Sequence, residues 1–277
     1  MTIRLPVGQD HQRARLLDAL DGHRLVAVTG PGGSGKSVLA RTAADDHPDS
    51  LVVDLARARE SDLTDLPRTG LLVLETCEHV LDRCAQLVED RLAAGTGQRI
   101  LLTGRESIGA GERTLSPAPL GPDDAARLYH QVSGGLAVDP LVLARLDGLP
   151  LAVHIAAEHL LDTRTLAARL DDGTFYDLPA APHHPERHTT LRASAAWSHA
   201  LCSSADRMTW ALLATLPGAF SLDEAQAVLD RDAREPVARL VEKSVLVVDV
   251  LARDARWYRM PQYLRAYVLP QPLAFTL

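Results

Sequence analysis

Apolar residues in the first 104 positions form short runs separated by longer stretches of mixed character. The short runs, bounded by glycine or polar residues, are typical of strands that are buried on both faces. The longer stretches place apolar residues near a 3.6-residue spacing, which predicts helices. The predicted strands are 24–30, 51–55, 71–75 and 99–104, and the predicted helices are 10–21, 36–46 and 77–95. This alternation predicts a parallel sheet covered by helices.

The pattern changes near residue 120. Residues 121–183 show only helical periodicity, which Pro122, Pro140 and Pro150 divide into short helices. The segment 187–277 is expected to hold several helices, then two strands joined by a turn at Asp254, then a short helix, which is the order of a winged helix. We therefore predict an α/β P-loop NTPase domain over 1–120, a helical domain over 121–183 and a winged-helix domain over 187–277.

Composition narrows the class of protein. Hydrophobic residues make up 46% of the 277 and charged residues 23%, and no apolar run is long enough to span a bilayer. The N-terminus lacks the apolar core of a signal peptide, so we expect a cytoplasmic protein with no membrane partner. The net charge of −7 argues against broad attraction to nucleic acid. Three cysteines without CxxC spacing indicate buried or idle thiols, not a disulfide framework or a zinc site.

The sequence "GPGGSGKS" at 30–37 carries the clearest chemistry. It follows a predicted strand and opens a predicted helix, the context in which this spacing binds phosphate. The glycines let backbone N–H groups curl around phosphate oxygens, Lys36 adds a positive charge, and the Ser37 hydroxyl is a ligand for Mg²⁺. The residues expected to contact ATP or ADP here are Gly30, Pro31, Gly32, Gly33, Ser34, Gly35, Lys36, Ser37 and Val38. The alternative is a glycine-rich turn with no ligand.

Two acids follow the third predicted strand. Glu75 ends the run "LLVLE", where a carboxylate would lie beside Mg²⁺, so Ser37 and Glu75 are the predicted metal ligands. A glutamate is one methylene longer than an aspartate, which makes its fit to octahedral magnesium imperfect. Thr76 cannot act as a base, so Glu78 is the nearest candidate to orient water, although an acid in the first turn of a helix also has a structural explanation. Glu75 and Glu78 are thus the catalytic candidates, for a weak ATPase at most.

The next strand ends in Thr103 and Arg105. A threonine and an arginine beside a phosphate site can sense the γ-phosphate, the arginine through a charge-assisted hydrogen bond. A surface arginine in a loop is the alternative, and spacing does not decide between the two.

Taken together, these segments resemble the NB-ARC type of STAND ATPase, found as the core of large bacterial transcriptional regulators of the antibiotic-regulatory or LuxR type. "VTGPGGSGKSVLA" resembles the P-loop of that family, "LLVLETCEHV" its Walker B strand and "RLDGLPLAVHIAAEHL" its GLPLA helix. "YRMPQYLRAYVL" resembles part of its winged helix. The resemblance implies that Val7, Gly8 and Pro150 contact the nucleotide and that Arg105 reads the γ-phosphate.

The chain departs from the family at three places. Glu75 and Thr76 replace an Asp-Asn pair, Gln9 replaces an arginine on the adenine side, and Pro261 replaces a histidine that contacts ADP in many relatives. The resemblance therefore implies a site that holds nucleotide better than it cleaves it.

We expect a nucleotide-dependent switch that binds ATP or ADP with Mg²⁺ and hydrolyses slowly if at all. Its partners would be an effector or sensor domain in the same chain or a separate protein, and a nucleotide-dependent homo-oligomer is compatible with this role. The alternative is a DNA-binding transcription factor that acts through its own winged helix. Arg239 and Lys243 of the candidate recognition helix are offset by Glu235 and Glu242, so we do not expect direct DNA binding. A small-molecule kinase would leave the last 157 residues unexplained.

Overall fold

The computed structural model describes residues 7–56, 66–182, 185–250 and 256–269. It divides the chain into two compact units, 1–118 and 119–277. The predicted turn at Asp254 lies outside the described residues. None of the helices described combines the length and apolar character needed to cross a bilayer.

The first unit is built on a five-stranded parallel sheet with strand order β2-β3-β4-β1-β5. Its strands are β1 Leu25–Thr29, β2 Ser50–Asp54, β3 Leu71–Glu75, β4 Arg99–Gly104 and β5 Arg113–Leu115. Its helices are α1 Asp10–Gly22, α2 Lys36–Ala44 and α3 Leu81–Ala93, with a 3₁₀ turn, η2, at Cys77–His79. The predicted parallel α/β core is confirmed, while β5 was not predicted.

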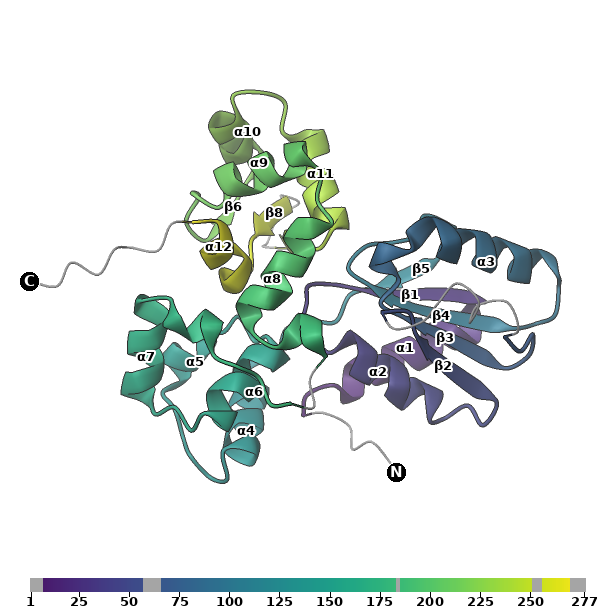
Figure 1. Cartoon of the computed structure of the whole chain (residues 1–277), viewed down its shortest axis with the longest axis horizontal. Helices are drawn as coiled ribbons and strands as arrows, with labels where there is room; N and C mark the ends of the chain where they lie inside the picture. Colours follow the sequence, from purple (N-terminus) through teal and green to yellow (C-terminus); the bar gives the residue numbers. More distant parts are fainter. Residues whose placement is uncertain (1–6, 57–65, 183–184, 251–255, 270–277) are drawn as a thin grey trace, which may run out of the picture. The chain divides into compact units, whose positions relative to one another are not determined.

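Helices α1 and α2 lie on one side of the sheet and α3 on the other (Figure 1), and alternate strand residues pack against the two layers. Val26 and Val28 of β1 pack in one apolar cluster with Leu16 and Leu20 of α1 and with Leu39 of α2. The intervening residues of the same strand pack with α3 in a second cluster, which also holds the buried thiols of Cys77 and Cys84. This two-sided burial explains why the strands read as continuous apolar runs.

The second unit combines short helices with a small antiparallel sheet of order β6-β8-β7. Its first helices are α4 Pro122–Val132, α5 Pro140–Ala144, α6 Pro150–Glu158 and α7 Thr163–Asp171, followed by 3₁₀ turns at Thr174–Asp177 and Glu186–His188. The later elements are α8 Leu191–Ala200, α9 Ser204–Leu213, β6 Ala219–Phe220, α10 Leu222–Leu229, α11 Arg234–Glu242, β7 Val247–Val250, β8 Arg256–Arg259 and α12 Gln262–Val268. Pro122, Pro140 and Pro150 each occupy the first turn of a helix, where their missing N–H costs nothing. The division of this unit into helical and winged-helix domains stays a prediction.

Candidate functional site

The glycine-rich loop connects β1 to α2 at the carboxyl end of the parallel sheet. Gly33 and Gly35 adopt left-handed backbone angles, with φ of 81° and 89°, which side chains rarely permit. Gly35 is the N-cap of α2 and provides no side chain to cap it, so the positive end of the helix faces the loop. The loop geometry is therefore the kind that binds a phosphate group.

Lys36 folds back over this loop. Its Nζ donates hydrogen bonds of 2.8 Å to the carbonyl oxygens of both Gly30 and Pro31. Ser34 is buried beside it, and its Oγ has no hydrogen-bond partner among the residues that the structure describes. Ser37 and Val38 lie in the first turn of α2, with Val38 exposed. The loop thus gathers the ammonium group, a buried hydroxyl and the first turn of a helix within one short segment.

The segment before α1 is joined to this loop through Gln9. A Cβ on Gly35 would overlap the amide nitrogen of the Gln9 side chain, which is only 2% exposed. The neighbouring Val7 and Gly8 are half-buried, and Gly8 has a φ of 77°. The N-terminal segment therefore lies against the phosphate loop through Gln9, and the nucleotide contacts of Val7 and Gly8 stay a prediction.

Glu75 lies at the end of β3 and is fully buried. Both of its oxygens accept hydrogen bonds from Arg41 of α2, Oε1 from Nε at 3.0 Å and Oε2 from Nη2 at 2.6 Å. This hydrogen bonding is the largest cause of the raised pKa of Arg41. The predicted metal ligand is thus the counter-ion of a cation from the protein itself, and as it stands its carboxylate does not fit a magnesium site.

Thr76 adopts a left-handed conformation with φ of 65°. Its hydroxyl donates to Oδ1 of Asp54, at the end of β2, at 3.1 Å, and its backbone N–H donates to Oγ1 of Thr103 at 3.4 Å. Such a conformation is rare for a β-branched residue and costs free energy. Residues that end the neighbouring strands β2, β3 and β4 are therefore joined by hydrogen bonds around Thr76.

Glu78 and Arg105 form a buried ion pair beyond the ends of β3 and β4. The distance from Arg105 Nε to Glu78 Oε1 is 3.7 Å, and each side chain is at most 4% exposed. A Cβ on the adjacent Gly104 would be tight against the backbone oxygen of Glu106, at 3.2 Å, and would touch Glu78 Oε2 at 3.5 Å. The predicted γ-phosphate sensor and the predicted water-orienting acid are thus direct partners.

Pro150 belongs to the second unit, where it begins α6. Its predicted contact with the nucleotide stays a prediction. Arg41, Asp54 and the position of Gln9 were missed by sequence reasoning. One signal was present for Arg41, because it lies four residues after Ser37 and therefore on the same face of the helix.

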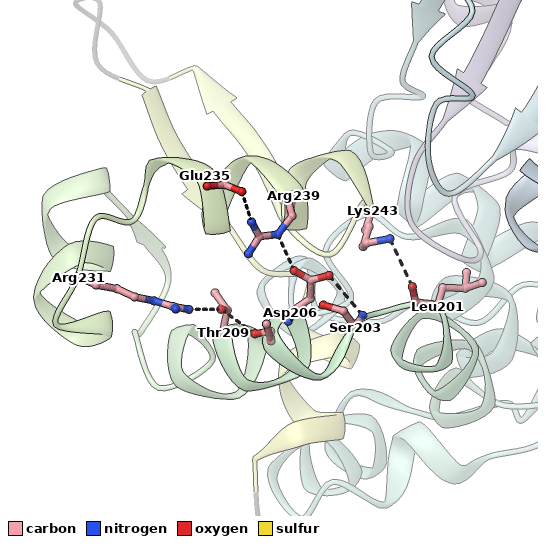
Figure 2. A network of polar contacts seen from close by, with 9 residues as sticks. Leu201, Ser203, Asp206, Thr209, Arg231, Glu235, Arg239 and Lys243 are labelled. Atoms are coloured by element: carbon pink, nitrogen blue, oxygen red, sulfur yellow. Dashed lines mark hydrogen bonds and ion pairs between the residues drawn. The ribbon is translucent and has the colours of Figure 1, made fainter. Parts of the chain in front are cut away.

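The basic residues of the predicted recognition helix contact their own unit (Figure 2). Arg239 of α11 donates to the buried Asp206 of α9 at 2.8 Å and to Glu235 at 2.6 Å. Lys243 donates to the carbonyl oxygen of Leu201 at 3.3 Å. These side chains stabilise the packing of α11 against α8 and α9, which does not favour a role in reading DNA bases.

The fold and loop place the chain among proteins with the P-loop ATPase fold. The Walker-type ATPase PABY2304 of Pyrococcus abyssi superposes with a TM-score of 0.56 over 95% of this chain and 95% of its own, at 12% identity. At that identity the similarity shows the fold alone.

Sequence comparison then gives the family. The chain is 31% identical over 302 aligned positions to the uncharacterised protein Rv0894 of Mycobacterium tuberculosis, covering 90% of this chain and 77% of that protein, and it belongs to the same family. It is also 33% identical over 296 positions to the protein named "Putative HTH-type transcriptional regulator Rv0890c" from the same organism. That match covers 89% of this chain but only about a third of the regulator. No family model matches the chain.

Proposed function

We propose that this chain is a nucleotide-dependent switch module of the STAND, NB-ARC type that binds ADP or ATP in the first unit. The observation that carries the proposal is the loop at 30–37, with left-handed glycines, an uncapped helix start and Lys36 at the carboxyl end of a parallel sheet. Magnesium commonly accompanies nucleotides in P-loop sites, where Ser37 is the residue of this chain that would contact it.

Hydrolysis in this proposal is slow. Thr76 offers no base, and Glu78 is held against Arg105 instead of standing free to orient water. Arg105 is then the proposed sensor, because a γ-phosphate would compete with Glu78 for its guanidinium. Nucleotide exchange, not rapid turnover, would change the state of the module.

The proposed output lies in the second unit, which we interpret as helical and winged-helix domains. The regulator Rv0890c is about three times as long as the region it shares with this chain, so we propose that such a module works with effector or sensor segments in cis or with a protein partner. A ligand changes the output only if its affinity differs between two conformations of the module. Self-association that depends on nucleotide is one form that this output would take.

Two measurements on the full chain test the proposal. Calorimetry should detect binding of ADP or ATP that is lost in Lys36→Ala, because alanine lacks the ammonium group that would contact the phosphates. All three tryptophans, Trp197, Trp210 and Trp257, lie in the second unit. A change in their emission when ADP replaces ATP would therefore report a response outside the binding unit. Equal heats for wild type and Lys36→Ala would refute nucleotide binding at the 30–37 loop, and binding with unchanged emission would refute the switch.

A further inference from the structure

Side chains alternate between the two faces of the sheet along β3, and this alternation determines the direction in which the Glu75 side chain points. Leu71 and Val73 pack in the apolar cluster that contains Leu39, Ala40 and Ala43 of α2, whereas Leu72 and Leu74 pack in the cluster on the opposite face. Glu75 continues the series of Leu71 and Val73, so it projects toward α2. This places the carboxylate beneath the helix that begins at the phosphate loop.

Arg41 meets this carboxylate from α2 with two parallel hydrogen bonds of 3.0 and 2.6 Å. The paired geometry is the strong form of an arginine–carboxylate contact. Glu75 is fully buried, whereas the Arg41 side chain is 46% exposed. The guanidinium therefore covers Glu75 from the solvent side while part of it stays accessible.

A divalent cation on Glu75 would have to share the carboxylate with this guanidinium, and like charges repel. If the metal displaced Arg41, the strong bidentate pair would be lost. The metal would then have to replace both hydrogen bonds that Arg41 gives to the fully buried carboxylate. The residues present thus favour the pair over a metal at Glu75.

The guanidinium of Arg41 is placed to supply the positive charge that a metal ion would otherwise supply to the nucleotide phosphates. It lies one helical turn after Ser37 and on the same face of α2. A guanidinium has five N–H donors, and Glu75 takes two of those on Arg41. Guanidinium groups are well suited to binding phosphate oxygens, so the exposed part of Arg41 offers donors of the right kind.

We propose that Arg41 takes the place of the metal ion in this nucleotide site, with Glu75 as its counter-ion, so that nucleotide binding needs no divalent cation. The inference rests on the proposed function, because it concerns the same bound nucleotide. It differs from the sequence prediction in the role of Glu75, which becomes a residue that positions Arg41.

The first experiment titrates the full chain with ADP by calorimetry, once in excess magnesium and once in EDTA. The wild-type dissociation constant should differ by less than about threefold between the two conditions. Titration with Mn²⁺ alone, followed by electron paramagnetic resonance, should show no site on the wild-type chain. A loss of affinity of about tenfold or more in EDTA, or a stoichiometric Mn²⁺ site, would overturn the inference.

The second experiment uses Arg41→Met, which removes the charge and leaves Glu75 available to a metal. This variant should bind ADP at least about tenfold more weakly in EDTA and should gain a dependence on magnesium and a Mn²⁺ signal. Unchanged affinity in EDTA would overturn the role of Arg41.

Because Arg41→Met leaves a buried carboxylate that can unfold the chain, Arg41→Met/Glu75→Met serves as a second variant. A buried ion pair can often be replaced by apolar residues without loss of folding. The double variant should bind ADP weakly in both conditions, and wild-type affinity in EDTA would contradict the inference.

The outcomes separate the two proposals. If neither wild type nor Lys36→Ala binds ADP in any condition, the proposed function fails and the inference fails with it. If wild type binds, Lys36→Ala does not, and the wild-type affinity depends on magnesium, then the nucleotide site stands and only the role of Arg41 is refuted.

Discussion

The carboxylate of Asp147 accepts a hydrogen bond of 2.6 Å from the backbone N–H of Gln262, the first residue of α12. The same carboxylate accepts a bond of 3.0 Å from Nη1 of Arg259, at the end of β8. Asp147 stands three residues before Pro150, so one side chain connects the turn that opens α6 to the last strand and helix of the second unit. Burial, the largest effect, raises the pKa of Asp147, and the bond from Gln262 and the charge of Arg259 oppose that rise.

This contact predicts a large effect of Asp147→Ala on stability. Alanine removes both hydrogen bonds and adds strain, because Asp147 has a left-handed φ of 56° that aspartate tolerates better than alanine. We expect the free energy of unfolding to fall by about 2–4 kcal/mol. Asp147→Asn keeps an acceptor for Gln262 and tolerates the same backbone angle, so it should cost only about 1–2 kcal/mol.

Urea unfolding followed by tryptophan emission checks this prediction, since all the tryptophans lie in the same unit as Asp147. Asp171→Ala is the matched control. Asp171 pairs with Arg145 in the same unit but is 70% exposed, so its loss should cost less than about 1 kcal/mol. Equal effects of Asp147→Ala and Asp171→Ala would contradict a connecting role for Asp147.

A substitution at Thr76, in the first unit, is expected to raise stability instead of lowering it. A β-branched residue at φ of 65° is strained, and asparagine adopts this conformation at lower cost. Thr76→Asn should therefore raise the stability of the first unit by about 1 kcal/mol. Thr76→Val keeps the strain and loses the hydrogen bond to Asp54, so it should lower stability by about 1 kcal/mol.

Residue-resolved hydrogen exchange on β3 and β4 measures the effect at Thr76, because protection in these central strands reports the opening of this unit. The first 118 residues contain no tryptophan or tyrosine, so tryptophan emission should not register either variant. Shifts of the same sign in Thr76→Asn and Thr76→Val would show that backbone strain is not the cause.

The first unit was largely predictable because its strands are buried on both faces. β1, β3 and β4 coincide closely with the apolar runs that predicted them. β5, at Arg113–Leu115, escaped prediction because it is short and partly exposed and is a strand only through its pairing with β1. The helix predicted over 77–95 begins instead as the turn η2 and continues as α3 from Leu81. The break accompanies Thr76, whose left-handed conformation no propensity would assign to threonine.

The site was less predictable than the fold. The loop at 30–37 is a local motif, and its spacing alone indicated phosphate chemistry. The partners of Glu75 and Arg105 depend on how α2 and η2 pack over the strand ends, which is tertiary information. Because side chains alternate between the two faces of β3, the sequence could have predicted that Glu75 points toward α2. Only the packing of that helix brings Arg41 to the Glu75 carboxylate. Glu75, which the sequence predicted to bind a metal ion, is therefore paired with the guanidinium of Arg41.

Arg239 should matter for stability and not for DNA binding. Its pairing with Asp206, whose side chain is 3% exposed, predicts that Arg239→Met lowers the free energy of unfolding by about 1–3 kcal/mol. Arg234→Met, on the same helix, removes an exposed ion pair with Asp232 and should lower stability far less than Arg239→Met does. Tryptophan emission in urea measures both. A mobility shift at low salt that wild type shows and Arg239→Met loses would contradict this prediction.

The same pair predicts a dependence on pH. Burial alone would raise the pKa of Asp206, but the hydrogen bonds from Arg239 and Ser203 outweigh it and lower the pKa below the ordinary value of 3.8. The unfolded chain therefore binds the proton first, and the ionised carboxylate stabilises the fold fully above that value. This stabilisation is lost as the pH falls below 3.8 toward the folded-state pKa. The difference in stability between wild type and Arg239→Met should narrow as the pH falls below 3.8, and a difference that widens would contradict this assignment.

Gln9 and Gln98 are equally buried in the first unit but differ in hydrogen bonding. Gln98 is 1% exposed, and its amide donates to the carbonyl oxygens of Pro67 and Thr69 at 2.9 and 3.2 Å. The Oε1 of Gln9 has no partner among the described residues. A buried acceptor without a hydrogen bond costs about 1–3 kcal/mol, so Gln9→Leu should stabilise the first unit by about 1 kcal/mol.

Gln98→Leu, the matched control, should instead destabilise the unit by about 2–3 kcal/mol, because the carbonyl oxygen of Thr69 loses this donor and Nη1 of Arg91 loses its acceptor on Oε1 of Gln98. Hydrogen exchange in β1 and β4 distinguishes the two signs. Under the proposed function Gln9→Leu should also weaken ADP binding, because the amide nitrogen of Gln9 lies against Gly35 of the phosphate loop and is a donor that a phosphate oxygen can accept from. A residue that serves only the fold would not gain stability and lose affinity in one substitution. Destabilisation by Gln9→Leu, with ADP affinity unchanged, would show that Gln9 is an ordinary core residue.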